Sequence, residues 1–235
     1  MMLAVRVIPT LLYRGETLVK GKQFQSWRSV GHVQQAARIH AMRGVDELCC
    51  LDIGATPEGR GPNFALVEKL TDGNFCPVTV GGGVRTVEDV KLLLRAGADK
   101  VAIKTKALDL IPRVADAVGS QAVVASLDHS TKYAAVDPVM LACEFEMYGA
   151  GEILLTSILR EGMMEGYDLE MIKAVSEAVS IPVIAHGGCG TYLHMLEAIQ
   201  SGASAVAAGA MFQFTDQTPR GAAEYLSSKG IEVRL

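Results

Sequence analysis

Two glycine runs mark places where this chain could hold an anion. Gly82 and Gly83 follow one short apolar run, and Gly187 and Gly188 follow another, each just before a helical pattern. Glycine lets a ligand approach the backbone closely, and the N–H groups at a helix start favour negative charge. Tight strand-to-helix turns would also need glycine. Two such runs nevertheless predict a pair of phosphate sites, the second extended by Gly209 after a later apolar run.

The two glycine runs belong to an internal repeat. At an offset of 105 residues, the segment beginning at Pro77 aligns with the segment beginning at Pro182, and Glu47 aligns with Glu152. A repeat of this length predicts two similar halves with a site between them. A ligand with a phosphate at each end would fit such a site.

Charged residues stand at both ends of the apolar runs. Asp52 and Asp128 end two of them, where a carboxylate could act as an acid or a base. A second group stands at the starts of runs: Arg6, Glu47, Lys100 and Glu152. Ionised residues in a protein core are costly unless paired, so the second group should form a closed network.

The elements that must position these residues are short strands alternating with helices. Eight apolar runs have strand length: residues 6–12, 47–53, 78–80, 100–103, 122–127, 152–157, 183–185 and 205–208. Thr86 and Asp89 resemble a capping box at one helix start, and Gly97 suits its end. The alternation predicts a single closed (βα)₈ barrel over residues 1–235, with chemistry where strands end. A dinucleotide-binding fold would need GxGxxG after the first strand, where the chain reads LLYRGE.

Composition excludes several classes of protein. The net charge is −4 with no basic run, so nucleic acid is not expected, and no apolar stretch is long enough to span a membrane. The beginning of the chain lacks the layout of a signal peptide, which favours a cytoplasmic protein. The five cysteines form no CxxC pair, and no metal or cofactor is expected.

Several motifs together resemble one family. DELCCLDIGA, TVGGGVR, LLLRAGADKVAI, GSQAVVASLD, GAGEILLTSI and SIPVIAHGGCG are similar to the cyclase subunit of imidazole glycerol phosphate synthase, over nearly the whole chain. The resemblance implies a barrel that binds a two-phosphate substrate and docks a glutaminase at its bottom face. Ammonia made by the glutaminase then travels through the barrel to the top.

The resemblance also implies roles for particular residues. Asp128 and Glu161 are the candidate catalytic residues, Glu161 standing for the acid of the family's DRDG motif. Asp99 matches a glutaminase-docking position. The four charged residues at strand starts match the family's ammonia gate, although a structural plug would use the same residues. The predicted substrate and phosphate contacts are Lys20 on the loop after the first strand, Asp52, Gly82, Gly83, Lys104, Thr156, His186, Gly187, Gly188, Gly209 and Ala210.

The chain departs from the family pattern where the chemistry should be. The family's first catalytic acid, at the end of the first strand, is replaced by Leu12, which cannot transfer a proton. Lys104 stands in place of a small amide, His186 in place of a serine, and the segment after Asp128 is short.

These departures favour a branch similar to the glycosyl amidation-associated proteins. Such a protein works with a glutaminase homologue and a sugar amidotransferase, and serves sugar amidation in surface polysaccharide biosynthesis. Two alternatives stay open: an authentic cyclase of histidine biosynthesis, and a non-catalytic barrel that binds a phosphosugar.

Overall fold

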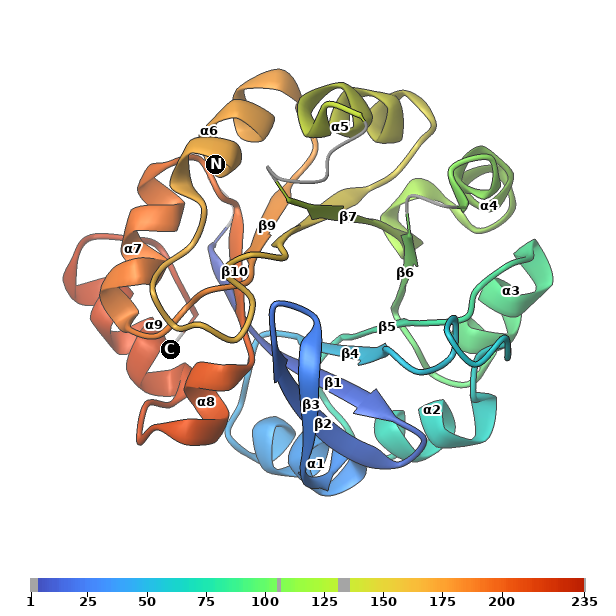
Figure 1. The fold of residues 1–235 in the computed structure, drawn as a ribbon, viewed down its shortest axis with the longest axis horizontal. Helices are drawn as coiled ribbons and strands as arrows, with labels where there is room; N and C mark the ends of the chain where they lie inside the picture. The colour runs from blue at the N-terminus through green and yellow to red at the C-terminus, as the bar shows by residue number, and fades with distance from the viewer. Residues whose placement is uncertain (1–3, 105–106, 131–135, 235) are drawn as a thin grey trace.

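The chain folds into one closed parallel barrel, seen along its axis in Figure 1. The structure is a computed structural model that describes residues 4–104, 107–130 and 136–234. Strand β10 pairs with β1 and closes the ring, with Arg6 opposite Ala205. The barrel strands are β1 (Arg6–Arg14), β4 (Leu48–Asp52), β5 (Val78–Gly81), β6 (Lys100–Lys104), β7 (Val123–His129), β8 (Glu152–Ser157), β9 (Val183–His186) and β10 (Ala205–Ala208). The predicted (βα)₈ barrel is confirmed.

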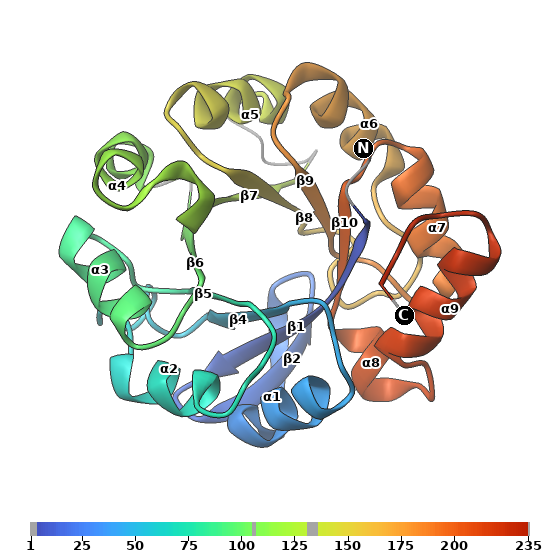
Figure 2. The same ribbon diagram turned by 180° about the vertical axis from the view of Figure 1, so that it is seen from behind.

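Helices surround the barrel on all sides (Figures 1 and 2). They are α1 (Val33–Met42), α2 (Phe64–Thr71), α3 (Val87–Arg95), α4 (Leu110–Val118), α5 (Pro138–Met147), α6 (Leu169–Ala178), α7 (Tyr192–Gln200), α8 (Ala210–Phe214) and α9 (Pro219–Ser228). The predicted capping box of Thr86 and Asp89 is present at the start of α3. Near the chain ends, Val5 N–H donates to the carbonyl of Glu232 at 2.8 Å.

A hairpin that the sequence did not reveal lies between β1 and α1. Its strands are β2 (Thr17–Lys22) and β3 (Gln25–His32), and β2 runs antiparallel to β1. The segment around Lys20, expected to be a loop, is therefore a strand. The hairpin tip crosses the barrel mouth (Figure 1), where the backbone N–H and side chain of Gln23 donate to the carbonyls of Glu161 and Leu159, both at 2.9 Å.

The internal repeat reappears as paired side-chain contacts. A Cβ on Gly97 would lie 2.5 Å from Thr71 Oγ1, and a Cβ on Gly202 would lie 2.8 Å from the Cβ of Ser176. Gly202 and Ser176 each stand 105 residues after their counterparts. The helix that ends at each glycine therefore packs against the preceding helix at the same point in both halves.

Capping repeats as well, with one change of chemistry. The side chain of Asp89 accepts the Arg85 N–H at 3.0 Å, and Thr86 caps the same helix. In the second half, His194 Nδ1 accepts the Gly190 N–H at 3.2 Å. His194 therefore replaces a carboxylate in the cap of α7.

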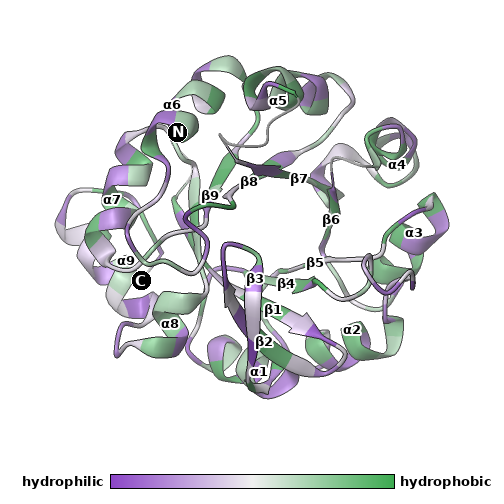
Figure 3. Ribbon diagram, in the orientation of Figure 1, coloured by the Kyte–Doolittle hydropathy of each residue, from purple (hydrophilic) through white to green (hydrophobic). Residues whose placement is uncertain are grey.

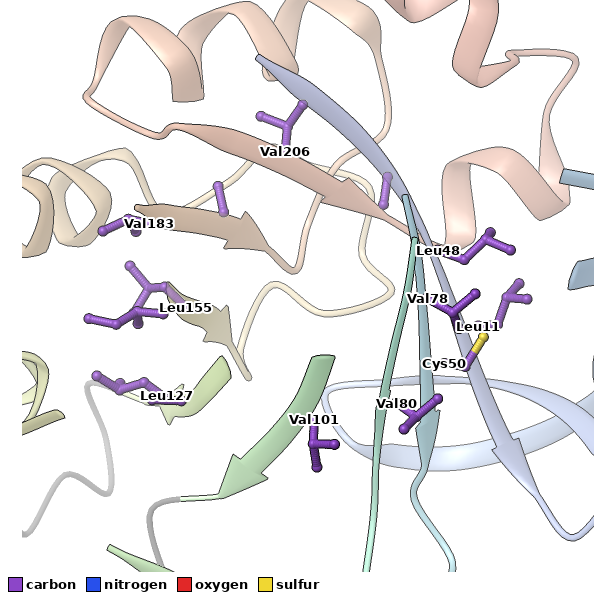
Figure 4. Packing of buried hydrophobic residues seen from close by; sticks show 14 of the residues in the cluster. Leu11, Leu48, Cys50, Val78, Val80, Val101, Leu127, Leu155, Val183 and Val206 are labelled. Atoms are coloured by element: carbon purple, nitrogen blue, oxygen red, sulfur yellow. The ribbon is translucent and has the colours of Figure 1, made fainter. Parts of the chain in front are cut away.

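Two apolar layers result from the alternation of side chains along each strand. The larger lies between strands and helices and includes Val101, Leu127 and Leu155 (Figure 4). The helices themselves carry hydrophobic and hydrophilic residues around their axes (Figure 3). The smaller layer fills the barrel interior with Ile8, Cys49, Ala102, Val124, Leu154, Ile184, Ala205 and Ala207. The gap within that inner layer has no volume able to hold a water molecule.

The paired glycine contacts predict an order of stability among alanine variants. Gly97→Ala combines a side chain at φ +98° with a collision against Thr71, whereas Gly73→Ala meets only the strain of φ +71° in open space. Strain alone costs about 1–2 kcal/mol, and overpacking adds about 1–3 kcal/mol. Urea unfolding should therefore rank Gly97→Ala clearly below Gly73→Ala in free energy of unfolding. Equal losses would mean that the contact between the helices is unimportant.

Candidate active site

A cavity of about 800 Å³ opens at the carboxyl ends of the strands. Strand residues such as Leu12, Ala102 and Ser126 line it together with Phe24 and Trp27 of the hairpin. It is lined by Leu12, Arg14, Phe24, Trp27, Leu51, Asp52, Ile53, Thr56, Pro57, Gly81, Gly82, Gly83, Val84, Arg85, Ala102, Lys104, Ala107, Asp109, Leu110, Arg113, Ser126, Asp128, Thr156 and His186. Its size is typical of small-molecule sites, and its position is that of active sites in (βα)₈ barrels.

Asp128 is the predicted catalytic carboxylate that reaches this cavity. It lies near the end of β7, and its Oδ2 accepts a hydrogen bond from Lys104 Nζ at 2.8 Å. The same ammonium lies 5.6 Å from the centre of the Phe24 ring. Lys104, the departure from a small amide, therefore connects the carboxylate with the hairpin.

Leu12 occupies the part of the cavity wall where the family resemblance leads us to expect an acid. It pairs with Leu51 in the register of β1 and β4, and both residues line the cavity. Its side chain is buried. This part of the cavity is consequently apolar, and Asp128 faces it without a second carboxylate on β1.

The carboxylate of Asp52 accepts several hydrogen bonds from the loop after β4. It accepts from the backbone N–H of Gly54 at 3.0 Å and from Arg60 at 2.6 and 2.9 Å. Asp52 therefore holds the loop in place, and a Cβ on Gly82 would collide with its backbone carbonyl.

His186 and Thr156 form a buried polar pair in the cavity wall. Thr156 Oγ1 and His186 Nδ1 lie 3.1 Å apart. Burial lowers the pKa of His186 to about 3, and the charge of Lys20 contributes to the shift. The imidazole is therefore neutral at pH 7, with one ring nitrogen able to donate and the other able to accept.

Lys20 of the hairpin and Glu161, whose carbonyl accepts from the hairpin turn, are not among the residues that line the cavity. Burial lowers the pKa of Lys20 to about 8, opposed by the charge of Glu161. Burial also raises the pKa of Glu161, and its Oε2 has no hydrogen-bond partner among the described residues. The Lys20 ammonium packs directly against Gly209, where a Cβ would collide with it. The catalytic role assigned to Glu161 stays a prediction, and its side chain is separated from the cavity in this structure.

The second glycine run is covered by the loop between β8 and α6. A Cβ on Gly187 would lie 2.7 Å from the carbonyl oxygen of Ser157, and one on Gly188 would lie 2.9 Å from Arg160 Cβ. Neither glycine lines the cavity, nor does Ala210, which is buried at the start of α8. Of the glycines predicted as phosphate contacts, only Gly82 and Gly83 therefore line the cavity.

Several lining residues were not predicted from the sequence. The charged and aromatic ones among them are Arg14, Phe24, Trp27, Arg85, Asp109 and Arg113. Arg85 could have been found, because it lies two residues after the glycine run. The hairpin aromatics could not, since their position depends on how the hairpin folds over the mouth.

The bottom face holds a closed ring of ion pairs. Arg6 lies 2.6 Å from Glu47 and 2.8 Å from Glu152, and Lys100 lies 2.9 and 3.0 Å from the same two carboxylates. Thr79 Oγ1 adds a hydrogen bond of 2.6 Å to Glu47. Burial works against the charge of Arg6, but attraction by Glu152 and Glu47 raises its pKa overall. The expected closed network is present; its role as a gate stays a prediction.

Asp99, the predicted docking residue, has a structural contact. Its carboxylate accepts the N–H of Val78 at 2.8 Å at the start of β5. Within the described part of the chain, no group of His, Cys, Asp and Glu could hold a metal ion. No helix in that part is long and apolar enough to cross a membrane. The short segment after Asp128 lies mostly outside the described residues.

The buried ammonium of Lys20 predicts a distinctive pH dependence. Its pKa in the folded chain is about 8 against an ordinary value of 10.5, so folding carries a penalty of about 3 kcal/mol below pH 8, which disappears as pH rises through 10.5. Lys20→Met removes this penalty. Its free energy of unfolding relative to the native chain should therefore be higher at pH 7.5 than at pH 10.5 by up to about 3 kcal/mol.

Lys22→Met, in the exposed end of the same strand, is the matched control. Chemical unfolding at the two pH values measures both variants. A Lys20→Met difference that does not change with pH would contradict the buried ammonium.

Comparison with known proteins agrees with this geometry. The model of the family described as "Histidine biosynthesis protein" matches residues 6–218. A protein of Campylobacter jejuni subsp. jejuni serotype O:2, named "Putative imidazole glycerol phosphate synthase subunit hisF2", is 40% identical over 248 aligned residues that cover 100% of both chains. The chain therefore belongs to the histidine biosynthesis protein family and resembles its imidazole glycerol phosphate synthase subunits.

Proposed function

We propose that this chain is the ammonia-receiving subunit of a glutamine amidotransferase that serves sugar amidation instead of imidazole formation. The observation that carries the proposal is the contrast between the two ends of the barrel. The ring of Arg6, Glu47, Lys100 and Glu152 is complete, while Leu12 occupies the place of an acid at the mouth.

The bottom face supports a protein partner. Met42 ends α1, Phe75 lies between α2 and β5, and Met147 ends α5, so all three stand on the side where strands begin. Their side chains are 88%, 100% and 72% exposed. Large exposed apolar side chains on the face that carries the ion-pair ring are suited to docking another protein. A glutaminase of the kind implied by the family is the proposed partner.

The mouth supports ammonia transfer without the cyclase mechanism. Proton transfer by a positioned acid or base contributes about 10²–10⁴-fold to a rate, and Leu12 cannot supply it. Titratable groups in the cavity wall include Asp128 on β7, held by Lys104, and neutral His186 on β9. Ammonia is itself the nucleophile, so its addition to an activated acceptor needs one base instead of an acid–base pair. A separate amidotransferase would activate that acceptor.

An authentic cyclase of histidine biosynthesis is the second candidate. The observation in its favour is the name of the relative from Campylobacter jejuni, together with its identity over the full length of both chains. In that case proton transfer must come from a residue other than Leu12. A third candidate, a phosphosugar-binding scaffold, predicts neither cyclisation nor ammonia transfer.

The residue at position 12 separates the first two candidates. The purified chain, given ammonia and the two-phosphate cyclase substrate, should form no product above background. Leu12→Asp should raise the rate at least about tenfold, because it restores a proton-transferring group, and Leu12→Asn should not. Product formation by the native chain at ordinary enzyme rates would refute the sugar-amidation proposal.

The ring predicts a defect in coupling between subunits. Lys100→Met leaves Glu47 and Glu152 with Arg6 alone, which opens the ring and leaves buried negative charge. With the glutaminase and the sugar amidotransferase present, amidated sugar formed per glutamine hydrolysed should fall severalfold, while the rate with added ammonia should stay within about twofold.

Lys173→Met, on the exposed surface of α6, is the matched control for a lost lysine charge. Thermal unfolding of both variants shows whether Lys100→Met still folds. Unchanged coupling in a folded Lys100→Met variant would support a structural plug instead of a gate.

A further inference from the structure

The cavity is asymmetric although the barrel repeats. It reaches Gly82 and Gly83 of the first glycine run, whereas Gly187, Gly188 and Gly209 of the second half lie outside it. The second half is closed by the protein itself. The Lys20 ammonium fills the space over Gly209, and the loop after β8 packs on Gly188. Only one end of the cavity therefore remains open to an anion.

The open end carries positive charge without protein partners. Arg85, after β5, and Arg113, on α4, both line the cavity. Among the described residues, neither guanidinium forms an ion pair or a side-chain hydrogen bond. Arg14 and Lys104, which also line the cavity, are paired with Glu58 at 3.0 Å and with Asp128 at 2.8 Å. The two unpaired arginines, beside the glycines, are suited to phosphate oxygens.

Part of the cavity lining is apolar and aromatic. Leu12 and Leu51 form an apolar wall, and Phe24 and Trp27 stand on the hairpin that crosses the mouth. The two aromatic rings lie 6.5 Å apart and are tilted by 33°. Because Leu12 stands where the family resemblance places an acid, this wall carries no charge.

We propose that the cavity binds a ligand with one anionic end, of the nucleoside diphosphate class. Its base lies between the apolar wall and the hairpin aromatics, and its phosphates contact Gly82, Gly83, Arg85 and Arg113. The ligand is therefore unlike a compound with a phosphate at each end. This inference rests on the proposed function only in assigning the acceptor of ammonia to the same cavity.

Trp27 makes the test direct, because it is the only tryptophan of the chain. The fluorescence of the isolated chain is followed during titration with uridine diphosphate, uridine, pyrophosphate, fructose 6-phosphate and fructose 1,6-bisphosphate. Uridine diphosphate should change the signal with at least tenfold higher affinity than uridine or pyrophosphate. The bisphosphate should bind no more tightly than the monophosphate, because the second end is closed.

Variants assign the binding to the proposed residues. Arg113→Gln and Arg85→Gln should each weaken uridine diphosphate about tenfold. Leu12→Asp should weaken uridine diphosphate while leaving pyrophosphate unchanged. Arg95→Gln is the matched control, since Arg95 lies on α3 outside the cavity and pairs with Glu88 at 3.6 Å.

Three outcomes would overturn the inference. They are no response to uridine diphosphate at millimolar concentration, equal affinity in Arg113→Gln and the native chain, and a bisphosphate that binds tenfold more tightly than the monophosphate. None of them affects coupling to a glutaminase, which is measured with the partner present. If the chain transfers ammonia together with its glutaminase but does not bind nucleotides, the proposed ligand class is wrong and the proposed function is unaffected.

Discussion

The interior of a closed parallel barrel must be filled by every second side chain of each strand, and this constraint arranges the whole molecule. The inward residues form three successive layers here: an ionic ring at the strand starts, apolar side chains in the middle, and a mouth that combines polar groups with an apolar wall. The middle layer has no volume for water. Charges at the bottom are therefore separated from the solvent at the mouth, and they must pair with one another, as Arg6 and Glu47 do at 2.6 Å. Layers of different polarity in one barrel give its two ends different chemistry.

The consequences of this alternation are visible in the sequence. The expected strand boundaries agree closely with the observed ones, because buried parallel strands consist of short apolar runs. The ionic ring is indicated by the charged residues at the first position of four of those runs. The hairpin of residues 17–32 was missed, although its Lys20 was singled out as a substrate contact. Nothing local indicates that Lys20 would be buried against Gly209, because that contact joins segments from opposite ends of the chain. The packing of a loop on Gly188 cannot be predicted for the same reason. A glycine that lets a ligand approach and a glycine that lets a neighbouring loop approach cannot be distinguished in the sequence.

In both halves, corresponding glycines allow the preceding loop to pack closely. The two glycine runs differ in their access to the cavity, which only the first run lines. Gly83 meets Arg60 and Gly188 meets Arg160, so each loop packs on the glycine of the next strand. The difference lies in the group placed over the mouth. The hairpin follows β1, and its lysine enters the second half, where burial disfavours the charges of both Lys20 and Glu161. A protein retains such a buried, poorly satisfied pair when the closed hairpin is useful, since apolar side chains would hold it more firmly.

Position 12, where Leu12 replaces the expected acid, and the ionic ring, which is kept, are under different structural constraints. The ring stabilises the start of several strands at once, so removing one member leaves unpaired charge in the core. Leu12 belongs to no such network, because it is apolar and its neighbour in the strand register is Leu51. Under the proposed function, the mouth chemistry is therefore lost first and the bottom face is kept, whatever the new acceptor is. That order of loss makes the mouth, and above all the residues facing Leu12, the part of the chain where a new substrate class is expected to be encoded.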